Sequence, residues 1–261
     1  MVFPLPCRPL TASLFLLAGP LGGQEPPRYD IGQLACATFR ESITSFVRPS
    51  PGRPVETGRR GFIRVRAAPT ATDSLAIEMW YDSLAVWRRS EDGELRPDTD
   101  GLIGGRYRGA LAPDGGYAPR VSPFVPEEVA QVADLASMAR DFFPRLPPRA
   151  LTPGDEWRGT YTTIAREPDS LVAGVPLARY RIDLRRDRTD VQTVGPGLTP
   201  IDISLREEER GRLVWHPELG LLRRERLVVV ESEIPAQGPI KRPSRNHIEQ
   251  RIVVERVAGC D

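Results

Sequence analysis

The sequence predicts a mainly β protein, a curved antiparallel sheet or half-barrel packed on one main α-helix. Most of the chain alternates apolar and polar residues with a period of two, which is typical of strands with one buried and one solvated face. Clusters of turn-forming residues separate these stretches. One stretch, residues 126–143, spaces its apolar side chains at helical intervals instead. An apolar helix stripe needs another layer to cover it, so we expect this helix to lie against the sheet.

The alternation is clearest at Tyr180, Ile182 and Leu184, which share one face of a predicted strand while charged residues occupy the other. The turn from His216 to Gly220 joins two long predicted strands into a hairpin. Strands are expected over residues 37–47, 60–67, 74–89, 103–110, 156–166, 178–185, 201–215, 221–234 and 248–254.

The predicted helix has recognisable ends. Pro126 suits the first helical position, Glu127 and Glu128 suit the positive end of the helix dipole, and Pro144 stops the helix. Its apolar stripe consists of Val129, Val132, Leu135, Met138 and Phe142.

The first 23 residues have the pattern of a secretory signal peptide. Arg8 precedes an apolar stretch over residues 10–18, and the small residues Gly22 and Gly23 follow it. The apolar stretch is too short to span a bilayer, which takes about 20 residues. We therefore expect export to the periplasm or the extracellular space, with residues 24–261 forming a single β-rich domain. An uncleaved anchor or a disordered tail remains an alternative.

The charge balance excludes one class of partner. Arg8 is the only charged residue of the signal segment, so residues 24–261 carry 35 basic and 35 acidic residues. Nucleic acids and anionic membranes bind concentrated positive charge. We therefore expect neither nucleic acid nor an anionic membrane as the main partner, and we interpret most arginines as solvated strand faces. The short apolar stretch, in turn, predicts no transmembrane span.

Two cysteines remain after removal of the signal, Cys36 and Cys260. An exported protein can keep a disulfide, and an even pair is the expected number. The bond would close nearly the whole domain into one loop. In the chain-entropy model, such a closure stabilises the folded state by roughly 4–5 kcal/mol. Two unrelated thiols are the other interpretation.

The sequence contains no motif that predicts an enzyme. There is no G-x-S-x-G or S-x-x-K pattern, and His216 and His247 stand far apart, without the C-x-x-C or H-E-x-x-H spacing of a zinc site. The glycines at positions 101, 104 and 105 precede a strand-like segment, which lacks the geometry of a phosphate cradle. We predict no catalytic residue, no metal site and no cofactor.

Aromatic side chains are the strongest candidates for a binding surface. Apolar pockets with a few polar groups are the usual form of ligand sites. Trp80, Trp87, Tyr161 and Trp215 are therefore predicted to line a ligand-binding cavity between the sheet and the helix. A plain packed core is the alternative interpretation of the same residues.

The segments Phe142–Pro147 and Leu151–Trp157 carry a resemblance to known proteins. They resemble a signature of uncharacterised bacterial secreted proteins, in which a proline-bounded link leads from a helix to a Gly-Asp-x-Trp turn. The overall order of elements is similar to the lipoprotein-carrier half-barrels (LolA-like and LppX-like). That resemblance implies acyl chains on the concave face of the sheet and no catalytic residues.

The function expected from these observations is a non-enzymatic envelope protein that binds an apolar ligand, a lipid or a lipid-modified partner in the concavity of its sheet. The first alternative is a structural or protein-interaction module with a solid core, working through its strand edges or through residues 235–243. A secreted hydrolase is the third.

The predicted processing is testable by intact-mass spectrometry of the exported protein. We expect a chain that begins at Gln24 and is one H₂ lighter than its reduced form, because the Cys36–Cys260 bond removes both thiol hydrogens. A full-length mass, or free thiols that react with a maleimide under denaturing conditions, would contradict it.

Overall fold

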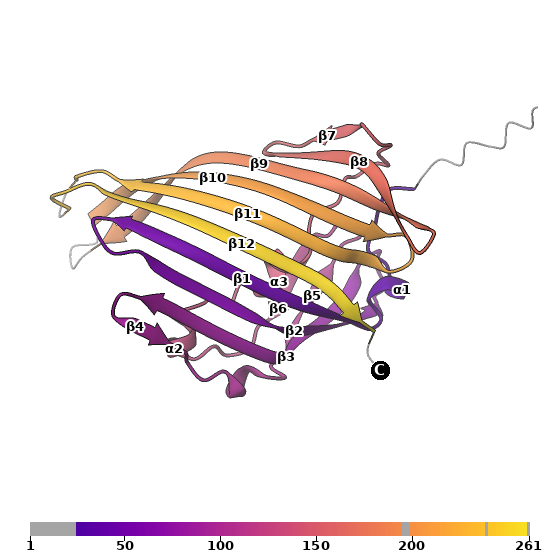
Figure 1. Ribbon diagram of the computed structural model, residues 1–261, viewed down its shortest axis with the longest axis horizontal. Helices are drawn as coiled ribbons and strands as arrows, with labels where there is room; N and C mark the ends of the chain where they lie inside the picture. The colour runs from indigo at the N-terminus through magenta and orange to yellow at the C-terminus, as the bar shows by residue number, and fades with distance from the viewer. Residues whose placement is uncertain (1–24, 195–198, 238–239, 260–261) are drawn as a thin grey trace, which may run out of the picture.

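The computed structural model describes residues 25–194, 199–237 and 240–259, and the strands of this part form one 12-stranded antiparallel sheet (Figure 1). The predicted signal segment and Cys260 lie outside the described residues. The strand order is β6-β5-β3-β2-β1-β12-β11-β10-β9-β8-β7, and β4 pairs with β3 beside this path.

The strands differ widely in length, and the longest lie between β8 and β1. They are β1 (Ala37–Ser50), β2 (Val55–Pro69), β3 (Leu75–Ser90), β4 (Gly93–Leu95), β5 (Tyr107–Leu111), β6 (Tyr117–Val121), β7 (Glu156–Arg158), β8 (Thr162–Val172), β9 (Val175–Val194), β10 (Thr199–His216), β11 (Gly220–Ile234) and β12 (Ser244–Ala258). The helices are short: α1 (Ile31–Leu34), a 3-10 turn η1 (Asp100–Leu102), α2 (Glu127–Ala130) and α3 (Met138–Phe142).

The sheet consists of two meanders joined in its middle by the β1–β12 pair. This ladder pairs Thr38 with Ala258, so the first and last strands of the domain run side by side. The chain therefore leaves β12 beside the start of β1, which Cys36 precedes directly. The Cys36–Cys260 disulfide itself stays a prediction.

The sequence located most of this sheet correctly. Each stretch predicted as strand contains strand, and β10 and β11 form the predicted hairpin, from the Ser204–Glu233 pair to the His216–Gly220 pair. The short strands β4 and β6 were not predicted, because neither carries an apolar alternation.

The prediction of one main helix over residues 126–143 is wrong. The longest helix in the described part has five residues, and the chain leaves the helical path between α2 and α3. The Asp134 carboxylate accepts hydrogen bonds from the backbone N–H and the hydroxyl of Ser137, at 3.1 and 2.6 Å. Such local side-chain bonds compete with helix formation. The Asp134 carbonyl, in turn, accepts a hydrogen bond from Arg59 on β2.

Burial of the predicted stripe is nevertheless confirmed. All five stripe residues lie in the hydrophobic core, although only Val129 belongs to α2 and Met138 and Phe142 to α3, while Val132 and Leu135 lie in the non-helical stretch between them. We call residues 122–155, between β6 and β7, the covering segment. It covers one face of the sheet in irregular form where a helix was expected.

The two faces of the sheet have different surroundings. Phe39, Ile63 and Val254 point into the core, and we call their side of the sheet the covered face. Their neighbours along each strand point to the opposite side, the open face. Figure 1 shows the sheet curving, with α3, β5 and β6 behind its central strands.

Aromatic edge-to-face contacts join the covering segment to the sheet. Phe142 contacts Phe39 on β1, with ring centroids 5.2 Å apart. Tyr29, before α1, lies between Phe143 and Trp215 of β10, at 5.3 and 5.1 Å. Each such pair adds about 0.5–1.5 kcal/mol beyond the area it buries.

A buried ion pair lies at the centre of the covered face. Arg59 donates to the Glu41 carboxylate at 2.9 and 3.2 Å, and the Tyr81 hydroxyl donates to the same carboxylate at 2.7 Å. Burial raises the pKa of Tyr81 well above its usual value, so this hydroxyl remains a donor. The network joins β1, β2 and β3, and Arg59 extends it to the covering segment.

Breaking this network on one side is expected to be costly. Arg59→Met leaves Glu41 buried without its cation, and we expect a loss of about 3–5 kcal/mol in the free energy of unfolding, measured by urea denaturation. Replacing Glu41, Arg59 and Tyr81 together by Leu, Met and Phe is expected to cost less than the single change.

The matched control is Arg40→Met, which removes the exposed Arg40–Glu255 pair on the open face. Such pairs contribute about 0–1 kcal/mol. Equal losses from Arg59→Met and Arg40→Met would contradict a special role for the buried pair.

Candidate ligand-binding surfaces

Beyond the buried ion pair, the covered face continues into an apolar row. Val55, Val47, Ile248 and Val230 lie on adjacent strands and are paired across them, and we call these four residues the distal row. All four are half-buried, and only Val230 packs against the main core. In Figure 1 the ends of β9–β12 at this side project beyond α3, β5 and β6. The distal row is an apolar surface that the core leaves partly uncovered.

A cleft lies on the same face, four residues along β11 from the distal row, between the covering segment and strands β8–β11. Its volume is about 360 Å³, within the range of roughly 300–1,000 Å³ that is usual for small-molecule sites. Its apolar walls include Phe143, Ile182 and Leu184. Its polar lining consists mainly of charged side chains: Arg140, Asp141, Arg145, Glu209, Arg224 and Arg226.

Two of these arginines have carboxylate partners. Arg226 binds both oxygens of Glu209, with 2.6 Å between Arg226 Nε and Oε1. Arg145 binds Asp114 at 2.7 Å, at the mouth of the cleft. Arg140 and Arg224 form no ion pair with any carboxylate among the described residues. The cleft therefore carries an excess of positive charge.

Arg224 is the most buried of the four. Its Nη1 donates hydrogen bonds to the carbonyls of Asp141 and Phe142, while its Nε has no partner in the described structure. Burial lowers the pKa of Arg224 to about 10, further lowered by Arg226 and partly offset by Glu209. The guanidinium is thus still charged at neutral pH.

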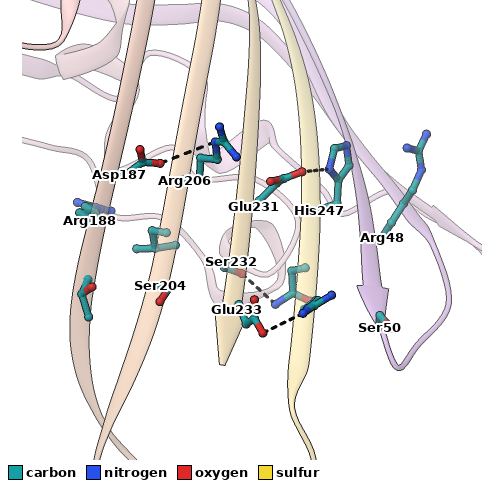
Figure 2. A pocket seen from close by; sticks show the side chains of 14 residues that line it. Arg48, Ser50, Asp187, Arg188, Ser204, Arg206, Glu231, Ser232, Glu233 and His247 are labelled. Atoms are coloured by element: carbon teal, nitrogen blue, oxygen red, sulfur yellow. Dashed lines mark hydrogen bonds and ion pairs between the residues drawn. The ribbon is translucent and has the colours of Figure 1, made fainter. Parts of the chain in front are cut away.

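A larger hollow lies on the open face, with a volume of about 850 Å³ (Figure 2). We call it the trough. Its floor is built of two rows of side chains across β1, β12, β11, β10 and β9, as the strand register shows. One row is Arg48, His247, Glu231, Arg206 and Asp187, and the other is Ser50, Arg245, Glu233, Ser204 and Thr189.

Most charges in the trough are paired with each other. Figure 2 shows Glu231 beside His247, at 3.6 Å, and Arg206 beside Asp187, at 3.8 Å. In the second row Glu233 binds Arg245 at 3.1 Å. A surface of mixed, paired charge suits a polar partner and offers little to an apolar ligand.

The predicted binding residues Trp80 and Trp87 lie on the open face, since their neighbours Met79, Tyr81 and Val86 belong to the core. Trp80 is buried beneath Arg106, whose guanidinium carbon is 3.6 Å from the ring centroid. Trp87 donates to Glu56 at 3.3 Å.

The other two predicted residues lie elsewhere. Trp215 is buried in the core against Tyr29, and Tyr161 is 54 % exposed. The structure does not bring the four aromatic residues together in one cavity, and their part in ligand binding stays a prediction.

The distal row and the cleft were missed by the sequence reasoning, although a signal for them exists. On β11, Arg224 and Arg226 share a strand face with Val228 and Val230. Charged residues in the apolar register of a strand indicate buried or functional charge.

The histidines have ordinary surroundings. His216 Nδ1 accepts hydrogen bonds from the backbone N–H groups of Glu218 and Leu219, as turn residues do. Within the described residues no serine hydroxyl is hydrogen-bonded to either imidazole, and no cluster of His, Cys, Asp and Glu could hold a metal ion. No helix of the described part is long and apolar enough to cross a bilayer.

Comparison with known proteins gives a fold likeness and no family. No family model and no curated protein matches the sequence. A solved structure of lipovitellin, reported for its lipid–protein interactions, resembles this chain with a TM-score of 0.52 and 10% identity. The likeness covers 87% of this chain but 26% of the lipovitellin chain, so this chain spans about a quarter of that protein.

A DUF1329 family protein from Desulfovibrio piger ATCC 29098 is also similar, at 8% identity over 88% of this chain and 89% of that one. Its TM-score is 0.19, too low to support an argument. The lipovitellin likeness supports the large antiparallel sheet. The resemblances to the Gly-Asp-x-Trp group and to the lipoprotein carriers stay predictions.

The position of Trp80 generates a prediction. Arg106→Ala removes the nearer of two guanidinium groups over its ring, the other being that of Arg66 at 5.4 Å, and we expect a loss of about 1 kcal/mol in unfolding free energy. Quenching of tryptophan fluorescence by acrylamide should rise as the indole becomes accessible. Arg120→Ala, at an exposed position of β6, serves as the control and should change neither measurement. Unchanged quenching in Arg106→Ala would contradict the arrangement.

Proposed function

We propose that this protein is a non-enzymatic, exported lipid-binding protein that holds an apolar chain against the covered face of its sheet. The observation that carries the proposal is the distal row, an apolar strip across four strands at the end of the face that the core leaves partly uncovered. A ligand that covers such apolar surface stabilises the complex by about 25 cal/mol for each Å² that it removes from water.

The fold likeness adds support. Lipovitellin, whose solved structure concerns lipid–protein interactions, shares the large antiparallel sheet. In the present chain the apolar strip is extended by half-buried Leu205 and Ile234 on the same face. The predicted secretory signal agrees with a role in the periplasm or the extracellular space.

The trough favours a second candidate, a protein-interaction module. Its charged and polar side chains across five strands match a polar protein surface better than a lipid. This candidate takes its partner on the open face and needs no ligand on the covered face.

Native mass spectrometry distinguishes the two candidates. We expect the mature protein, purified from a periplasm without detergent, to carry extra mass that organic extraction removes and identifies as lipid. A bare protein from such a preparation would refute the lipid proposal and leave the interaction module.

A pair of adjacent substitutions tests the location. Val230→Asp places a carboxylate in the distal row. We expect at least tenfold less retained lipid, because covering an unpaired carboxylate with an apolar chain is energetically unfavourable. Val229→Asp places the same charge on the open face of the same strand and should retain lipid as the wild type does. Thermal unfolding of both variants checks that each is folded. Equal retention in both would place the lipid elsewhere.

A further inference from the structure

We infer that the cleft on the covered face holds the carboxylate head group of the bound molecule, with Arg224 and Arg140 as the recognising side chains. The ligand class is a fatty acid or a similar single-chain amphiphile. This inference rests on the proposed lipid-binding function and specifies its ligand.

The first argument is the unfinished hydrogen bonding of Arg224. Its side chain is almost fully buried, at 7% exposure, yet its Nε has no acceptor, and among the described residues no carboxylate lies within ion-pair distance of its guanidinium. A buried donor without a partner is costly, and more so on a charged group. An anionic oxygen in the cleft, which Arg224 lines, would supply the missing negative charge.

The second argument is the charge of the cleft. Glu209 and Asp114 neutralise Arg226 and Arg145. Arg140, Arg224 and Asp141 remain, which leaves one excess positive charge. That excess matches a monoanion. Arginine's planar donor fork also suits a carboxylate.

The third argument is continuity between the cleft and the apolar row. Along β11 the covered face presents Arg224 and Arg226 in the cleft, then Val228 and Val230 towards the distal end. Arg224 and Val230 are six residues apart on β11, about 20 Å at the usual rise per strand residue. A long-chain molecule with its head at Arg224 therefore reaches the distal row with the far end of its chain.

The test compares two ligands of equal chain length, palmitate and hexadecanol, which differ in head-group charge. Their affinities for the delipidated mature protein are measured by titration calorimetry. We expect palmitate to bind roughly 10- to 100-fold more tightly, as hydrogen bonds to a charged group predict. Arg224→Met and Arg140→Met should each reduce this preference at least threefold without weakening hexadecanol binding. Arg120→Met, outside the cleft, is the control.

The outcomes separate the two proposals. Equal affinity for both ligands, or a preference that survives both arginine substitutions, would overturn the inference and leave the lipid-binding function intact. Failure of both ligands to bind would overturn the function and the inference together. Acetate binding as tightly as palmitate, with the same dependence on Arg224, would show an anion site for small carboxylates and refute the lipid assignment. Should Arg224→Met not fold, exposed Arg140 carries the test, because its side chain is not part of the core.

Discussion

The hydrogen bonds that two sheet arginines donate to the covering segment are the constraint on which the structure depends. Arg59 reaches the carbonyl of Asp134, and Arg224 reaches those of Asp141 and Phe142. A buried segment without a long helix leaves carbonyls that no helical N–H can satisfy. The two guanidinium groups supply those donors. They hold an irregular chain against the curved sheet, whereas a regular helix satisfies most of its carbonyls internally.

These hydrogen bonds determine which part of the covered face lies under the covering segment and which part does not. The ion pairs Arg59–Glu41 and Arg226–Glu209, together with Arg224, form a polar belt across the middle of the face. On one side of the belt, aromatic contacts of Phe142 and Phe143 close a dry core. On the other side the strands continue without a comparable cover, and the face becomes an apolar strip. The cleft lies at the boundary, where charge meets apolar surface, and such a boundary suits an amphiphile.

The open face of the sheet is exposed to water. A wide sheet exposes one side to water, and here arginine–carboxylate pairs cover it, as Arg40–Glu255 and Arg108–Glu78 do. Each pair contributes little stability. Together they keep a broad, curved surface hydrated, and the trough is the place where that surface is hollow.

The sequence by itself determined the strands, their alternation, the β10–β11 hairpin and the burial of the stripe from Val129 to Phe142. These depend on local periodicity, which is written in consecutive residues. Only the tertiary structure decided that the stripe is divided between two short helices and the irregular stretch that joins them, because the bond from Arg59 to the Asp134 carbonyl connects residues far apart in the sequence. It also decided which face each tryptophan occupies. A bulge in β3 beside Ile63 changes the register there, and strand periodicity cannot locate such a shift. The cleft likewise exists only because β11 and the covering segment, far apart in the chain, meet at Arg224.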